Sequence, residues 1–100
     1  MPAVYQNPNK CYSFNQSLTT SLVGLSAQKC SEVVIINKTG QSVYIYDQNR
    51  FSDEHRLLLE DNESIALRGI TNTSEVSAKT ASGTGQVYYR TQFYSSSVQR

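Results

Sequence analysis

The acidic side chains are the first candidates for chemistry, because paired carboxylates can serve as a general acid and a general base. Six of the eight occur close together in the sequence, at Asp47, Asp53-Glu54, Glu60-Asp61 and Glu63. A glycosidase needs two carboxylates held several ångströms apart across a cleft. The acidic residues here fall in predicted turns, where Asp and Glu are common, so we interpret them as solvated turn residues. A calcium site on Asp47, Asn49 and Asp53 would lack the ligand spacing of a known calcium loop.

His55 is the only histidine of the chain. A general base needs a nucleophile and an orienting partner, and the spacing around His55 reveals neither. Gly83-Thr84-Gly85 is similar to half of a dinucleotide-binding fingerprint, but no predicted helix follows it, so we predict a hairpin turn there. The sequence has no phosphate-binding loop, metalloprotease motif or nucleophile elbow. We therefore expect neither catalysis nor a cofactor.

The two cysteines, Cys11 and Cys30, are too few for a disulfide scaffold. In a protein made in the cytoplasm, we expect both to be free, buried thiols. A disulfide that closes the loop between them is the alternative in an oxidising medium. Their spacing does not match that of zinc ligands, so a metal site is not expected.

Tyrosines supply the strongest argument for binding, since seven of the 100 residues are Tyr. Tyr44, Tyr46, Tyr88 and Tyr94 fall opposite the core positions of their predicted strands. Exposed tyrosines can anchor a protein interface or stack on sugar rings. The structural alternative is that they form the second half of a sandwich core. Sugar-binding modules commonly use Trp, which this chain lacks.

Composition restricts the partners. Nine Lys and Arg balance eight Asp and Glu, for a formal net charge of +1. This near-neutral chain lacks the basic excess of a nucleic-acid or anionic-membrane binder. Its longest apolar run, Val33 to Ile36, is too short to span a membrane. The N-terminal residues MPAVYQNPNK lack the features of a signal peptide, so we expect synthesis in the cytoplasm.

Apolar and β-branched runs predict an all-β fold. Val33–Ile36 and Val43–Tyr46 flank a short polar segment with Gly40, a pattern typical of a β-hairpin. Further strands are predicted at residues 56–60, 64–68, 74–79 and 86–94, whereas residues 18–25 form at most a strand broken at Gly24. No segment has a sustained helical period. Six to eight short strands predict an antiparallel β-sandwich, jelly-roll-like in topology.

Alternation along these strands assigns one face to the core, since successive side chains point to opposite faces of a sheet. The predicted core consists of Val34, Ile36, Val43, Ile45, Leu57, Leu59, Ile65, Leu67, Val76, Ala78, Val87, Tyr89 and Phe93. Burial of about a dozen such side chains leaves a modest net stability. Oligomerisation would add to it, so we expect a homo-oligomer.

The chain divides into an extended N-terminal arm, residues 1–17, and a β-sandwich domain, residues 18–100. The arm holds both prolines and few apolar groups, apart from a possible strand around Lys10–Phe14. Such a segment buries too little to order itself in an isolated domain. We expect Tyr5, Tyr12 and Phe14 to anchor it on a neighbouring subunit, with Tyr44, Tyr46 and Tyr88 as further interface residues.

From Leu25 onward, the order of features resembles small β-sandwich proteins in virions of tailed bacteriophages. CSEVVIIN is followed by QSVYIYD, then by RLLLEDNESIALRGI, and finally by VYYRTQFYS. The resemblance covers about three quarters of the chain. It implies a structural virion protein with no catalytic residues.

Within this group, a capsid decoration (cement) protein that binds the major capsid protein is the leading hypothesis. Trimers at local three-fold axes are common for such proteins. The alternatives are a neck, fibre or tail-tip component, or a carbohydrate-binding module for host adsorption.

Overall fold

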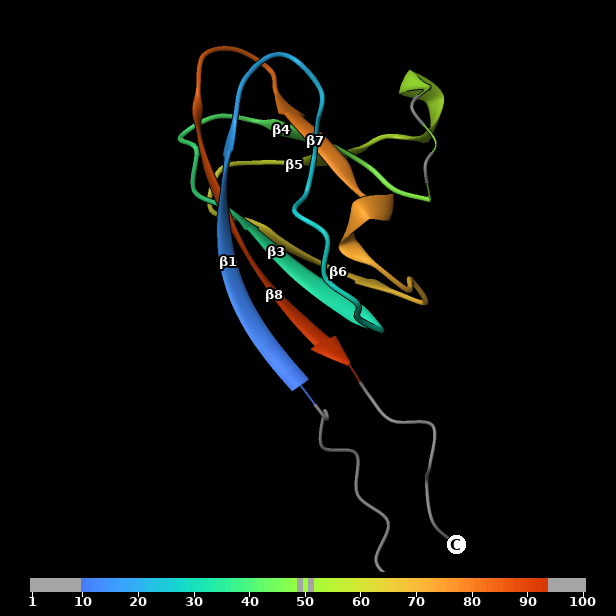
Figure 1. Cartoon of the computed structure of the whole chain (residues 1–100). Coiled ribbons are helices and arrows are strands. Elements are labelled where there is room, and N and C mark those ends of the chain that lie inside the picture. Colours follow the sequence, from blue (N-terminus) through green and yellow to red (C-terminus); the bar gives the residue numbers. More distant parts are fainter. Residues whose placement is uncertain (1–9, 49, 51, 94–100) are drawn as a thin grey trace, which may run out of the picture.

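The computed structural model describes residues 10–48, 50 and 52–93 and has an all-β fold (Figure 1). Two short 3₁₀ helices accompany eight strands. The elements are β1 Lys10–Leu18, β2 Val23–Gly24, β3 Glu32–Asn37, β4 Val43–Tyr46, η1 Asp53–His55, β5 Leu57–Leu59, β6 Ser64–Arg68, η2 Thr73–Glu75, β7 Ser77–Thr80 and β8 Gly85–Phe93. Among the described residues, no helix is long and apolar enough to cross a membrane.

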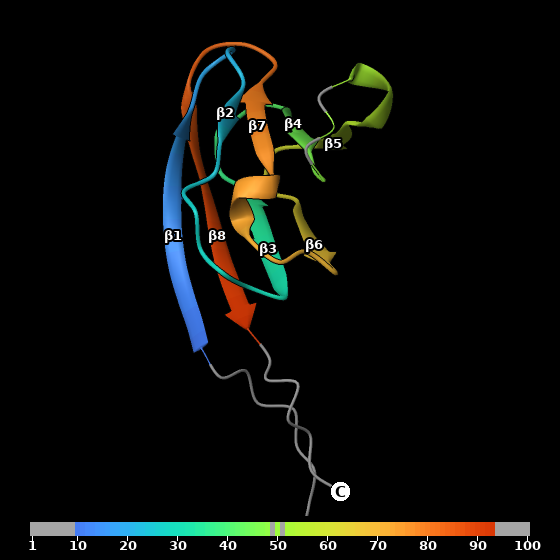
Figure 2. The same ribbon diagram turned by 45° about the vertical axis from the view of Figure 1, so that its right-hand side comes forward.

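The strands form two antiparallel sheets of four strands each. Sheet A has the order β1-β8-β3-β6, and sheet B has the order β2-β7-β4-β5. The two sheets pack as layers of a sandwich (Figure 2), and side chains from both contribute to one hydrophobic cluster. The expectation of an antiparallel β-sandwich is therefore confirmed.

The predicted β3–β4 hairpin is wrong, because the two strands lie in different sheets. β3 pairs with β6 and β8, whereas β4 pairs with β5 and β7. The intervening residues 38–42 cross from one sheet to the other, and Gly40 adopts a φ of 83° there. Apolar runs around a turn specify two strands and a reversal, but they do not specify which strands pair.

The turn at Gly83-Thr84-Gly85 is likewise not a hairpin, because it connects β7 of sheet B to β8 of sheet A. It packs against the β3–β4 crossing. The side-chain Nε2 of Gln41 donates to the backbone carbonyl of Thr84 (3.2 Å), and the side-chain Oε1 of Gln41 accepts from the Ser82 hydroxyl (2.9 Å). Two connections far apart in sequence thus support each other at one end of the sandwich.

The core differs from the predicted set mainly in strand β3. Val33 and Ile35 are fully buried, whereas Val34 and Ile36, predicted to be core residues, are half-buried on the opposite face. Four consecutive aliphatic residues contain no polar position to indicate which two face inward. Leu57 was also predicted in the core but is 38% exposed on the edge strand β5, and Phe93 is only half-buried.

The other predicted core positions hold. Val43, Ile45, Leu59, Leu67, Val76, Ala78, Val87 and Tyr89 are buried, and Ile65 packs against them. Cys30 is buried as expected, and, besides Val33, Ile35 and Tyr46, three buried residues were missed: Leu18, Leu25 and Ile70. They lie at strand ends or in connections, where no alternation marks them.

The segment expected to be an arm contains a strand. Residues 10–17 belong to β1, which pairs with β8 over nine consecutive residues, from Lys10 opposite Phe93 to Leu18 opposite Gly85. Residues 10–17 are therefore part of the β-sandwich, and the predicted boundary between arm and sandwich at residue 17 is wrong for them. Alternation of small polar with aromatic residues gave β1 enough burial to join the sheet, since Phe14 packs against the core and Leu18 is fully buried. Residues 1–9 lie outside the described residues.

A buried asparagine fixes the β3–β4 crossing. The Asn37 side chain is fully buried and donates to the carbonyls of Gln41 (2.6 Å) and Leu59 (2.9 Å). Its carbonyl oxygen accepts from the backbone N–H and the hydroxyl of Thr39, at 2.9 and 2.7 Å. A fully satisfied buried amide such as this one specifies one loop conformation.

Candidate protein interface

The outer face of sheet A, which turns away from sheet B, carries the main candidate site. Strand register places Asn15, Tyr88, Ile36 and Ser64 in one row across the four strands. The neighbouring row consists of Ser13, Arg90, Val34 and Ala66. The centre of this face is therefore apolar and aromatic, although it faces solvent.

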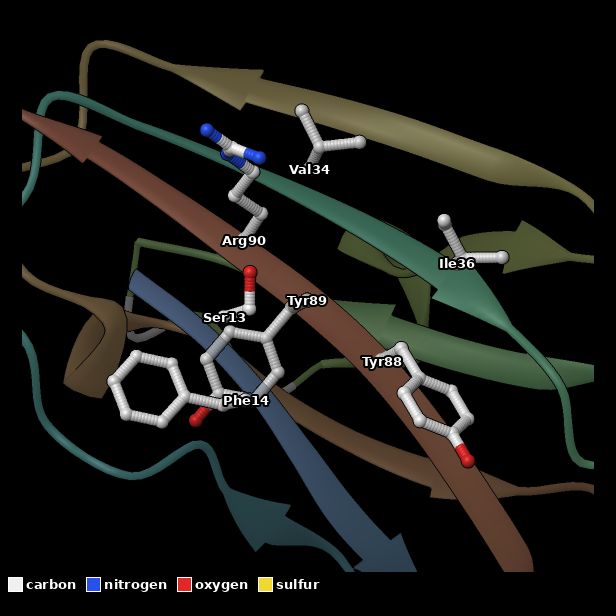
Figure 3. Close-up of a pocket in the computed structure, with 7 residues that line it drawn as sticks. All are labelled: Ser13, Phe14, Val34, Ile36, Tyr88, Tyr89 and Arg90. Carbon is white, nitrogen blue, oxygen red and sulfur yellow. The ribbon is translucent and has the colours of Figure 1, made fainter. Parts of the chain in front are cut away.

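A groove of about 400 Å³ lies over these rows. Figure 3 shows its lining residues, which come from β1, β3 and β8: Ser13, Phe14, Val34, Ile36, Tyr88, Tyr89 and Arg90. Tyr88 is 45% exposed, and Val34 and Ile36 are half-buried. An exposed tyrosine beside two β-branched side chains offers apolar contact area that loses little conformational entropy on binding.

Charge is placed at the border of the groove. The Arg68 Nε donates to the Glu32 carboxylate at 3.0 Å, beyond the Arg90–Val34 row. Arg90 is exposed and forms no ion pair with any residue of the described ranges. A guanidinium at the rim of an apolar groove can form a bidentate pair with a carboxylate on a partner.

Below the groove, Phe14 and Tyr89 connect this face to the core. Their rings stack with centroids 5.2 Å apart. The Tyr89 hydroxyl donates to the carbonyl of Ser26 at 3.4 Å, and burial raises the pKa of Tyr89. The floor of the groove is thus a fixed part of the sandwich.

The outer face of sheet B carries a second aromatic cluster, which is already occupied. The Arg56 guanidinium lies 3.8 Å from the centroid of the Tyr44 ring. Tyr46 donates from its hydroxyl to Asp53 (2.9 Å), and Asp53 also pairs with Arg56 (3.4 Å). Hydrogen bonding with Tyr46, reinforced by the Asp53 charge, raises the pKa of Arg56.

The structure separates the six predicted interface residues. Tyr88 lies in the groove, and Tyr12, 42% exposed, lies on the opposite face of sheet A. Phe14 is half-buried against the core, and Tyr44 is half-buried under Arg56. The expected exposure of Tyr46 is wrong, because the residue is 1% exposed and bonded to Asp53. Tyr5 lies outside the described residues, as does Tyr94.

Three groove residues were not identified from the sequence as interface residues: Val34, Ile36 and Arg90. The two aliphatic residues were assigned to the core, and no interface role was predicted for Arg90. Arg90 itself was the available signal. It shares one face of β8 with Tyr88 and Gln92, and a charged residue that alternates with core positions indicates a face that meets solvent or a partner.

Other residues with chemical potential lie apart from the groove. His55 is exposed in η1 together with Asp53 and Glu54, whereas Asp47, Glu60, Asp61 and Glu63 lie in the connections before η1 and after β5. Within the described ranges, no three His, Cys, Asp or Glu residues come together as a metal site. Cys11 and Cys30 are both free; Cys11 is half-buried on the outer face of β1, and Cys30 is buried in the core.

Comparisons of the chain with protein-family descriptions, curated proteins and solved structures found no match.

Proposed function

We propose that this protein is a structural component of a tailed-bacteriophage virion, most specifically a capsid decoration protein that binds the major capsid protein. The observation that carries the proposal is the apolar groove on the outer face of sheet A, whose lining includes Tyr88 and Arg90 of β8. A rigid β-domain that offers such a face can bury area across the seam between two subunits. The virion context rests on the sequence resemblance.

We further propose that the topology is a jelly roll. The pairs β1–β8, β2–β7, β3–β6 and β4–β5 nest as in one long hairpin whose two arms are folded over together. The additional pairs β3–β8 and β4–β7 join these ribbons into two sheets. Jelly rolls are a recurrent fold of viral capsid and lectin domains. The topology therefore supports a binding role and leaves the partner to be tested.

The groove suits a protein partner. Interface hot spots combine aromatic anchors and arginine with a surrounding ring that excludes water. Here Tyr88 is the anchor, Val34 and Ile36 provide apolar contact area beside it, and Ser13 and Arg90 add polar groups to the lining. Because the pairing of β1 and β3 with β8 fixes this arrangement, binding would require little reorganisation.

The test is co-sedimentation of purified protein with heads assembled by the phage after deletion of this gene. Tyr88→Ala removes the anchor from the groove, so we expect at least a tenfold loss of affinity, equivalent to about 1.4 kcal/mol. Leu58→Ala is the matched control, since Leu58 is 54% exposed on sheet B. Both variants should retain the wild-type melting temperature within a few degrees.

Two results would overturn the proposal. Wild-type protein that does not sediment with such heads would exclude decoration of the capsid. Equal losses for Tyr88→Ala and Leu58→Ala would exclude the groove as the contact. Specific binding of the monomer to a glycan array, with no binding to heads, would favour the carbohydrate-binding alternative.

A further inference from the structure

Strand β1 differs from the other three sheet edges. β2 has two residues and β5 has three, so each offers few backbone groups. β6 has five residues and ends in Arg68, which is paired with Glu32. β1 has nine residues in unbroken register with β8, without a bulge, and no charged or proline residue lies between Cys11 and Leu18. Natural sheets normally protect long edges with charge, proline or bulges.

The backbone groups on the free side of β1 can be assigned. The Ser31 N–H donates to the Gln92 carbonyl at 2.7 Å, so the backbone of Gln92 points toward β3 and away from β1. Cys11, opposite Gln92, is therefore a non-hydrogen-bonded position of the β1–β8 pair. By alternation, Ser13, Asn15 and Ser17 also direct their N–H and C=O groups outward. Ser13, Asn15 and Ser17 are exposed.

We propose that β1 pairs with β1 of a second copy of this chain, antiparallel about a two-fold axis, to form a continuous eight-stranded sheet. This interface adjoins the groove, whose lining includes Ser13 and Phe14 of β1, but it is formed by the strand edge and does not depend on the proposed function. With the two-fold axis at Phe14, all nine residues of β1 are paired, from Lys10 opposite the partner's Leu18 onward. The outward-directed residues then face one another, which is the requirement for backbone hydrogen bonds across an antiparallel pair.

Side chains support a second copy as the occupant. In this register, Cys11 lies opposite the partner's Ser17, and Ser13 lies opposite the partner's Asn15. These are small neutral side chains on the outer face, and none brings like charges together. The two Phe14 residues would meet across the axis on the other face, and aromatic cross-strand pairs stabilise antiparallel sheets. The same patch on both copies is self-complementary, as a two-fold interface requires.

Disulfide trapping tests both the interface and its register. Opposed residues in a hydrogen-bonded antiparallel pair have Cα atoms about 5.5 Å apart, within the range that a disulfide spans. Ser17→Cys places a new thiol opposite the partner's Cys11. Within one chain these positions are six residues apart, about 20 Å along the strand, and cannot be bridged. We expect Ser17→Cys to form a covalent dimer under mild oxidation, visible on a non-reducing gel.

Ser13→Cys is the matched control, because it makes the same change on the same face. In the proposed register its new thiol lies about four residues from the partner's Cys11, and the two copies of the new thiol are diagonal neighbours about 7–8 Å apart, beyond the usual disulfide range, so the covalent dimer should form at least tenfold more slowly. Equal cross-linking of the two variants, or none from either, would overturn the proposal. So would a wild-type protein that sediments as a monomer at millimolar concentration.

A second pair of variants covers a failure of Ser17→Cys to fold. Asn15→Lys introduces a charge at the β1 edge, where the two copies of the residue are diagonal neighbours about 7–8 Å apart. We expect sedimentation equilibrium to show at least a tenfold weaker dimer. Ser64→Lys adds the same charge on the opposite edge strand, β6, and should leave the dimer unchanged. An equal effect of both lysines would contradict the assignment to β1.

Discussion

At the scale of single residues, Gly85 shows why a turn motif without chemistry still constrains the sequence. A Cβ atom at Gly85 would lie 2.6 Å from the Cβ and 2.7 Å from the Cα of Thr39. Neither atom is the end of a flexible side chain, so the β3–β4 crossing itself would have to move. We expect Gly85→Ala to lower the free energy of unfolding by about 1–3 kcal/mol, measured by urea denaturation.

Gly24 provides the control for this substitution. A Cβ there would have its closest neighbour, the Ser77 hydroxyl oxygen, at 3.8 Å, an ordinary contact distance. Gly24→Ala should change stability by no more than about 0.5 kcal/mol. If both glycines tolerate alanine equally well, the close packing of the two crossings is not a source of stability.

Cys30 gives a residue-scale prediction about reactivity and pH. Burial raises the pKa of the Cys30 thiol, with the nearby Glu75 charge adding to the effect. Since the thiolate is the reactive form, native protein should be alkylated at Cys11 only, and both cysteines should react in denaturant. Mass spectrometry after brief alkylation measures this. Two native labels at equal rates would show that Cys30 is accessible.

The sign of the pH dependence follows from the same shift. The folded chain holds the Cys30 proton more tightly than the unfolded chain, whose thiol has the ordinary cysteine pKa of 9.0. Below pH 9.0 the thiol is protonated in both the folded and the unfolded chain, so it does not make the stability depend on pH. As the pH rises above it, the unfolded chain loses the proton first, and stability falls. Cys30→Ala should remove this part of the alkaline decrease, which thermal unfolding at increasing pH would detect.

At the scale of elements, strand β3 separates the two faces of sheet A. Ile35 is fully buried, whereas its neighbour Ile36 lines the outer groove. Ile35→Asp would bury an unpaired carboxylate and should prevent stable folding. Ile36→Asp places the same charge at the solvent side, so we expect a folded protein that loses roughly 1 kcal/mol. Circular dichroism melts of the two variants would distinguish them, and the reverse result would restore the original face assignment.

Most elements could be predicted from the sequence, because β-branched runs and turn residues are local signals. The strand predicted at residues 64–68 matches β6, and that at residues 86–94 is offset by one residue from β8. The one pairing that was predicted, between β3 and β4, is wrong, because pairing depends on which runs meet after collapse. The nearest neighbour in sequence, β4, was not the partner of β3.

At the scale of the whole molecule, the candidate site could be predicted only in part. Tyr88 was identified because its alternation with Val87 and Tyr89 could be read in β8. Its neighbours Val34 and Ile36 could not be, since a groove made by three strands exists only once their order is known. Tyr46 was misassigned for a related reason: η1 and its flanking loop supply the Asp53 that covers the hydroxyl.

The last prediction concerns the N-terminal segment and the groove together. Deletion of residues 2–9 leaves β1 complete, so the truncated protein should retain the wild-type unfolding midpoint. If that segment and the groove contact different parts of the capsid, its deletion should weaken co-sedimentation with heads at least tenfold.

The loss of affinity caused by the deletion should then multiply with the loss caused by Tyr88→Ala, because distant contacts contribute additively to the binding free energy. Combining the two changes should therefore weaken attachment about a hundredfold, equivalent to about 2.8 kcal/mol. Undiminished binding of the truncated protein would confine the interface to the sandwich, and a double variant no weaker than Tyr88→Ala alone would place both contacts at one site.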